Sequence, residues 1–67
     1  MGTYEEYTRK MASLKNHIRM ENTGTPNELA EKIGVSRRTV FHYLSILRDE
    51  GDVVKFSRIR QTYYYCE

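Results

Sequence analysis

The side chains of this sequence that could do chemistry are mainly basic, and they occur in two short segments. Arg37 and Arg38 lie in residues 36–42, and Lys55, Arg58 and Arg60 lie in residues 53–61, with no acidic residue in either segment. Guanidinium and ammonium groups bind phosphate oxygens, and an arginine also makes paired hydrogen bonds to the edge of a guanine. A net charge of +2 is weak evidence for a polyanionic partner. The distribution of the charge is stronger evidence, because the two segments would form one basic face if they lay side by side.

The first basic segment belongs to a pattern of two helices joined by a tight turn. Thr25 and Glu28 form a capping-box signature at the start of the first of these helices. Gly34 ends that helix as a residue that readily adopts the left-handed conformation, and Ser36 caps the second helix. Two short helices joined by a glycine turn are the outline of a helix-turn-helix, which we place at about residues 25–50.

The second of these helices has an apolar face and a polar face. Its apolar residues repeat at spacings of three and four: Val40, Tyr43, Leu44 and Leu47. At about 100° per residue, Arg38 and His42 lie opposite this stripe. In a major groove, Arg38 is the candidate for a guanine edge, and His42 is the candidate for a base acceptor or a phosphate. Ser36, Arg37 and Thr39, at the same end of the helix, are candidates for phosphate or base-edge contacts.

Beyond the second helix, about residues 53–66 predict two strands joined by a basic tip. β-Branched and aromatic residues are frequent there, and a polar segment of hairpin-loop length separates them. The tip contains no glycine, asparagine or proline, so its turn type is left open. A hairpin directly after a helix-turn-helix is the layout of a wing. In a wing, Lys55, Arg58 and Arg60 are placed to hold phosphates, and either arginine could instead enter a minor groove.

Alternation along the two strands predicts which side chains face the helices. Val54 and Phe56 share one face of the hairpin, and Lys55 points to the other. One face of the run Tyr63–Tyr65 is expected to pack on Phe56 or on the N-terminal helix. Three consecutive tyrosines are also typical of an edge strand that meets water or a partner, so we expect at least one of them to be exposed.

The run SRRTV at residues 36–40 resembles the start of the second motif helix in bacterial winged-helix regulators of the biotin-repressor-like and DeoR-like type. The resemblance covers residues 25–51 well and the flanks more loosely. It implies a winged helix-turn-helix that binds double-stranded DNA. Phe41 departs from the family, which commonly has a polar or basic residue at this position. Two interpretations of Phe41 stay open: packing under the wing or the first helix, which we favour, and contact with a thymine methyl group.

About residues 3–21 predict a long first helix. Its apolar residues form one stripe: Tyr4, Tyr7, Met11, Leu14 and Ile18. One interpretation is that this stripe completes a three-helix core, and the other is that it forms a coiled-coil-like dimer seam. Both hold if Met11 to Ile18 lie in the core while Tyr4 and Tyr7 contact a second protomer. We favour the core, because about two and a half heptads are few for a seam.

The sequence contains few features of other classes of protein. Cys66 is the one cysteine, and His17 and His42 lie on different predicted helices, so we expect no metal site, no cofactor and no catalytic residue. No apolar run approaches the roughly 20 residues of a membrane span. The N-terminus also lacks the pattern of a signal peptide. We therefore expect a reduced, cytoplasmic protein with no membrane partner.

The sequence thus predicts one α+β domain over residues 1–67: a three-helix bundle with a C-terminal two-stranded hairpin, a winged helix-turn-helix. The expected function is sequence-specific binding of double-stranded DNA by a small, nucleoid-associated transcriptional regulator that is not an enzyme. The alternative is a winged-helix module for protein–protein interaction or for RNA binding without DNA specificity. We also expect a homodimer, through the first helix or the C-terminal strand, because one module buries only about 600–1,000 Å² on DNA. No small-molecule effector is expected.

Overall fold

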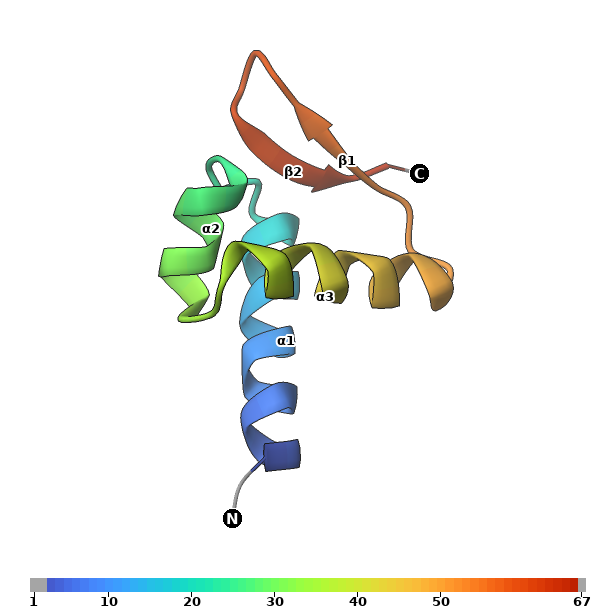
Figure 1. Cartoon of the computed structure of the whole chain (residues 1–67). Helices are drawn as coiled ribbons and strands as arrows, with labels where there is room; N and C mark the ends of the chain where they lie inside the picture. The colour runs from blue at the N-terminus through green and yellow to red at the C-terminus, as the bar shows by residue number, and fades with distance from the viewer. Residues whose placement is uncertain (1–2, 67) are drawn as a thin grey trace.

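The structure, a computed structural model, describes residues 3–66 as three helices followed by a two-stranded antiparallel hairpin. The elements in chain order are α1 (Thr3–Arg19), α2 (Pro26–Ile33), α3 (Arg37–Asp49), β1 (Val54–Ser57) and β2 (Thr62–Tyr65). In Figure 1, α3 crosses α1, and the hairpin lies over α3 and the C-terminal end of α1. This arrangement confirms the predicted α+β winged helix-turn-helix.

Side-chain caps fix the ends of the two motif helices. At the start of α2, the Thr25 N–H donates to Glu28 Oε1 at 2.8 Å and the Glu28 N–H donates to Thr25 Oγ1 at 3.3 Å, which is the predicted capping box. Gly34 ends α2 with a φ of 77°, in the left-handed region that favours glycine. The Thr39 N–H donates to Ser36 Oγ at 3.1 Å and so caps α3. The short segment between these caps is the tight turn of the motif.

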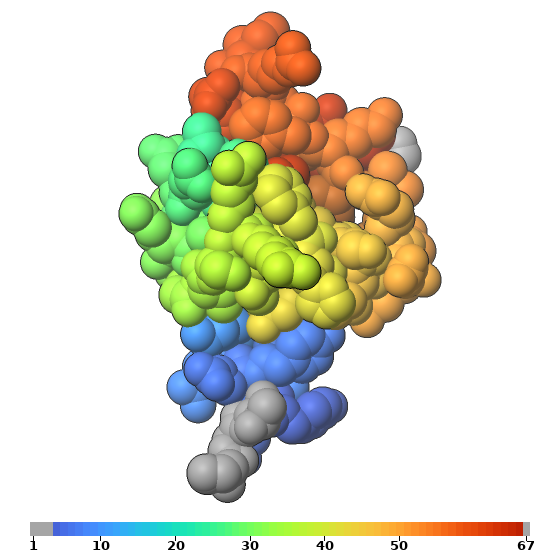
Figure 2. Space-filling model, viewed as in Figure 1, coloured from blue at the N-terminus to red at the C-terminus, as the bar shows by residue number. Residues whose placement is uncertain are grey.

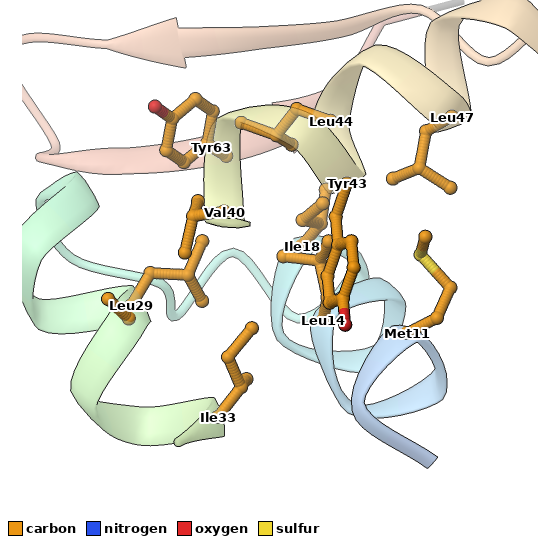
Figure 3. Packing of buried hydrophobic residues seen from close by; sticks show 11 residues of the cluster. Met11, Leu14, Ile18, Leu29, Ile33, Val40, Tyr43, Leu44, Leu47 and Tyr63 are labelled. Carbon is orange, nitrogen blue, oxygen red and sulfur yellow. The ribbon is translucent and has the colours of Figure 1, made fainter. Parts of the chain in front are cut away.

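One apolar core joins the three helices to the hairpin. Met11, Leu14 and Ile18 of α1 are buried in it, which confirms the core role predicted for this helix. Figure 3 shows these side chains close to Tyr43 of α3, with Tyr63 of β2 joining the cluster next to the same helix. The remaining members of the cluster are Leu29, Ala30, Ile33, Val40, Leu44 and Leu47. The core therefore holds α3 in place through the buried side chains of α1 and α2 and through Tyr63 of β2.

The N-terminal part of α1 extends past this core, as Figures 1 and 2 show. Tyr4 is 79% exposed there. Tyr7 instead packs against Tyr43 of α3, with ring centroids 5.5 Å apart in an edge-to-face arrangement. Of the two tyrosines considered for a dimer contact, Tyr7 is thus engaged within its own protomer and Tyr4 is available on the surface.

The register of the hairpin places Phe56 opposite Tyr63 and Lys55 opposite Tyr64. The rings of Phe56 and Tyr63 meet edge to face with centroids 4.9 Å apart, and Lys55 is exposed, as strand alternation predicts. The expectation of an exposed tyrosine in this run is wrong. Tyr63 is buried, and Tyr64 and Tyr65 are half-buried. Tyr65 is half-buried because it packs against the core cluster, on the strand that contacts α1.

The tip of the hairpin is an ordered loop although it contains no glycine. Gln61 takes the left-handed conformation, with a φ of 56°. Its N–H donates to Ser57 O at 2.8 Å, and its side-chain amide donates to Arg58 O at 2.7 Å. The Arg60 N–H donates to Ser57 Oγ at 3.2 Å. These bonds define the turn that the sequence left open: a four-residue loop closed by a hydrogen bond between residues four positions apart.

Two buried threonines join the hairpin to the segment between α1 and α2. The Thr23 N–H donates to Thr62 Oγ1 at 3.1 Å, and the Tyr63 N–H donates to Thr23 Oγ1 at 2.7 Å. The two hydroxyl oxygens are hydrogen-bonded to each other at 3.1 Å. Thr23 is 0% exposed and Thr62 is 4% exposed, so water does not reach these groups. The hydroxyls therefore fix the hairpin to the helical part of the chain.

Candidate nucleic-acid interface

The outward face of α3 carries the side chains that were expected to meet base edges. Arg38 and His42 are exposed, and so is Ser45 one turn further along the helix, whereas Val40 and Leu47 on the opposite face are fully buried. In Figure 2, α3 lies across the middle of the molecule with the hairpin above it. The periodicity of the sequence predicted this division of α3 correctly, and nothing in the described part of the chain covers the outward face.

Arg37, at the start of α3, interacts with a ring of its own helix and acts electrostatically on the hairpin. Its guanidinium carbon lies 5.6 Å from the centroid of the Phe41 ring, in a cation–π contact one turn along the helix. Its charge also acts on Tyr63 of β2. Burial raises the pKa of Tyr63 above its ordinary value, and the Arg37 guanidinium opposes part of this rise. The positive charge at the start of α3 therefore acts on the hairpin, whose first strand also contacts α3.

The cations predicted to contact DNA differ in how they are paired. Within residues 3–66, no carboxylate lies within salt-bridge distance of four of the predicted contact residues: Arg37, Arg38, Lys55 and Arg58. The Arg60 guanidinium, by contrast, pairs with the carboxylate of Glu21, just beyond the end of α1. A phosphate reaches Arg60 only if it shares this cation with Glu21 or displaces the carboxylate.

The start of α3 is suited to an anion. Its first turn contains two arginines and no acidic residue, although the N-terminal end of a helix already carries partial positive charge. Such guanidinium groups are slightly unfavourable unless an anion is present. The hydroxyl oxygens of Ser36 and Thr39 lie 2.9 Å apart, so one of their two protons makes this bond and the other is left to donate to an external oxygen.

A hollow of about 330 Å³ lies on the surface where α3 meets the hairpin. Its lining consists of Phe41, Leu44, Ser45, Arg48, Val54 and Tyr63. Phe41 borders this hollow on the wing side of α3, but it is 44% exposed and outside the core cluster, so the favoured interpretation, packing under the wing or the first helix, is wrong. Arg48 is exposed here and was not among the predicted contacts. It follows Arg37 by about three helical turns, so both lie on one side of α3. Arg48 was not predicted as a contact because the acidic residues that follow it make its segment of the sequence net acidic.

The described residues contain no group of three histidine, cysteine, aspartate or glutamate side chains that could hold a metal ion. Nor does that part of the chain contain a helix long and apolar enough to cross a membrane. The groups that α3 and the hairpin do present are cations and hydrogen-bond donors, which match phosphate oxygens and base edges.

A helix-turn-helix packed on a third helix and followed by a hairpin defines the winged helix-turn-helix class of fold. Residues 12–64 match the family model described as HTH domain (HTH_11). The chain belongs to this helix-turn-helix family, which is a family of DNA-binding domains and not of enzymes. No significant match was found among curated proteins or solved structures.

Proposed function

We propose that this chain binds double-stranded DNA sequence-specifically, as a small transcriptional regulator acting in the cytoplasm at the nucleoid. The N-terminal half of α3 enters the major groove, where Arg38 reads a guanine edge and His42 meets a base acceptor or a phosphate. Ser36, Arg37 and Thr39 hold phosphates at the start of the helix, where the helix dipole favours negative charge.

In this proposal the wing lies beside the same groove. Lys55 and Arg58 bind phosphates, or Arg58 enters the neighbouring minor groove, and Arg60 joins them when a phosphate competes with Glu21. The observation that supports the proposal most directly is the charge arrangement. Cations without a carboxylate partner come from the first turn of α3 and from the hairpin that packs on α3, within a helix-turn-helix domain.

A salt titration tests this proposal. Binding to a mixed-sequence duplex pool is followed by fluorescence anisotropy, and log K is plotted against log salt concentration. Because each neutralised phosphate contributes about 0.9 to the slope, Arg37→Ala/Arg38→Ala should reduce its magnitude by about 0.9, since Arg37 is the proposed phosphate contact of the pair. Lys55→Ala/Arg58→Ala removes two proposed phosphate contacts and should reduce it by about 1.8. Arg9→Ala removes an exposed arginine from α1, on the side of that helix away from the core, and should keep the wild-type slope.

Three outcomes contradict the proposal, and each points to a different conclusion. A folded wild type that binds no duplex at low salt favours the protein-interaction module. Equal slopes in all variants place DNA on another face. Equal affinity for duplex RNA and for the sequences selected from the DNA pool favours the RNA-binding module.

We further propose that the protein acts on two half-sites as a homodimer, without a small-molecule effector. The exposed Tyr4 on the projecting end of α1 is the favoured contact. The edge of β2 is less suitable, because Thr23 already binds the backbone of Tyr63 there. Light scattering should show a dimer for the wild type and a weaker one for Tyr4→Ser. A wild type that stays monomeric at all usable concentrations refutes this part.

A further inference from the structure

Phe41 is the exposed aromatic residue of α3. It is 44% exposed and lies outside the core cluster, and no other large apolar side chain of α3, all of which the structure describes, is exposed. An exposed apolar ring costs free energy in water, and this one lies within the helix proposed to enter the major groove.

The ring lies at the edge of the outward face of α3, on the side of the hairpin. At about 100° per residue, Phe41 lies about 60° from Arg38 and about 40° from Ser45 around the helix axis. The Arg37 guanidinium carbon lies over one face of the ring, 5.6 Å from its centroid, and the ring stays 44% exposed. The side chain also borders the open hollow between α3 and the hairpin. An approaching base edge can therefore reach the ring without any rearrangement of the core.

The chemistry of a phenyl ring limits what it can recognise. It neither donates nor accepts a conventional hydrogen bond, so it cannot read the polar groups of guanine, adenine or cytosine. The C5-methyl group of thymine is the apolar group on the major-groove edges of the standard base pairs. We propose that Phe41 is a specificity-determining residue that selects a 5-methylpyrimidine, thymine in ordinary DNA, next to the base read by Arg38. This inference rests on the proposed function.

The test measures the effect of one methyl group. A binding site is first selected from a random duplex pool with the wild type, and the thymine whose selection is lost in Phe41→Ala is identified. That thymine is replaced by uracil, which removes only the methyl group, and in a second pair of duplexes cytosine is compared with 5-methylcytosine. We expect the methyl group to raise wild-type affinity about fourfold in both pairs, the factor that corresponds to about 0.8 kcal/mol for one buried methylene-sized group.

Two further variants separate recognition from structure. Phe41→Leu keeps an apolar side chain and should keep part of the methyl effect, whereas Phe41→Ala should bind both members of each pair equally. Met20→Ala removes a 65%-exposed apolar side chain outside α3 and should keep the full fourfold effect. The salt slope should be the same in wild type and Phe41→Ala, because no charge changes.

The outcomes distinguish this inference from the proposed function. Sequence-selective binding in which uracil replaces thymine without loss overturns the role of Phe41 and leaves DNA recognition standing. So does a methyl effect that persists in Phe41→Ala. A wild type that binds no duplex overturns both.

Discussion

Replacement of Thr23 with valine removes one buried hydroxyl and keeps the shape of the side chain. In the folded protein, this hydroxyl accepts a hydrogen bond from the Tyr63 N–H at 2.7 Å and is bonded to Thr62 Oγ1 at 3.1 Å. Thr23 is fully buried, so no water replaces the lost oxygen. The Tyr63 N–H is then left without a partner inside the protein, directly where the hairpin meets the segment between α1 and α2.

The expected loss of folding stability follows from this unpaired N–H of Tyr63. Leaving a buried N–H unpaired costs about 1–3 kcal/mol. A chain of 67 residues has a free energy of unfolding of only about 3–10 kcal/mol. Thr23→Val should thus remove a large share of the stability. Thr62→Val should have a similar effect through the Thr23 N–H, which donates to Thr62 Oγ1. The double variant should cost less than the two single losses added, because both singles remove the same bond between the hydroxyls.

Urea unfolding followed by circular dichroism measures these losses. At a slope of about 1 kcal/mol per molar, the midpoint should fall by about 1–3 M for each single variant. Thr8→Val, at an exposed position on α1, is the matched control and should stay within about 0.5 kcal/mol of wild type. If Thr23→Val also stays within that margin, the hydroxyl pair does not hold the hairpin and our reasoning is wrong.

Three further predictions concern a helix cap, the loop at the tip and an ion pair. Hydrogen bonds from the backbone N–H and the hydroxyl of Thr25 hold the pKa of Glu28 below its ordinary value of 4.5. The charged carboxylate therefore stabilises the fold above about pH 4.5, and this stabilisation is lost as the pH falls through the lower pKa of the folded state. Glu28→Gln should therefore flatten the acid side of stability curves measured by urea unfolding from about pH 3 to 7. Gln61→Val should lower stability by about 0.5–1.5 kcal/mol in thermal melts, because valine cannot donate to Arg58 O and a β-branched residue tolerates a φ of 56° less well than glutamine, whereas Gln61→Asn should lose less. Glu21→Gln should free Arg60 and steepen the salt slope of DNA binding by about 0.9; an unchanged slope would place Arg60 away from phosphate.

The parts of the fold that follow from local rules were predictable from the sequence. The caps at Thr25 and Ser36 and the left-handed end at Gly34 depend on residues a few positions apart, and each is present as expected. The outward position of Arg38 and His42 on α3 follows from helical period alone. The approximate limits of the hairpin follow from strand propensity.

The features that the sequence could not predict join distant residues or depend on unfavourable backbone conformations. The bonds between Thr23 and Thr62 and the pair between Glu21 and Arg60 each span 39 positions, and neither has a local signature. The left-handed φ of Gln61 could not be predicted, because glycine or asparagine usually occupies such a position in a turn. The exposure of Phe41 was equally hidden, because its position at the edge of the apolar stripe fits either burial under the wing or contact with a ligand.

These distant contacts also position the cations of the hairpin relative to those of α3. The first turn of α3 is fixed by the core, but the hairpin is fixed to the segment just after α1, through the buried hydroxyls of Thr23 and through Glu21. The spacing between the cations of α3 and those of the wing therefore depends on a segment that belongs to neither, as well as on the packing of Tyr63 in the core. The two contacts differ in strength, because the hydroxyl pair of Thr23 and Thr62 is buried, whereas the ion pair of Glu21 and Arg60 is exposed to solvent and to salt. A phosphate can thus compete for Arg60 at the tip while the base of the wing keeps its place beside α3.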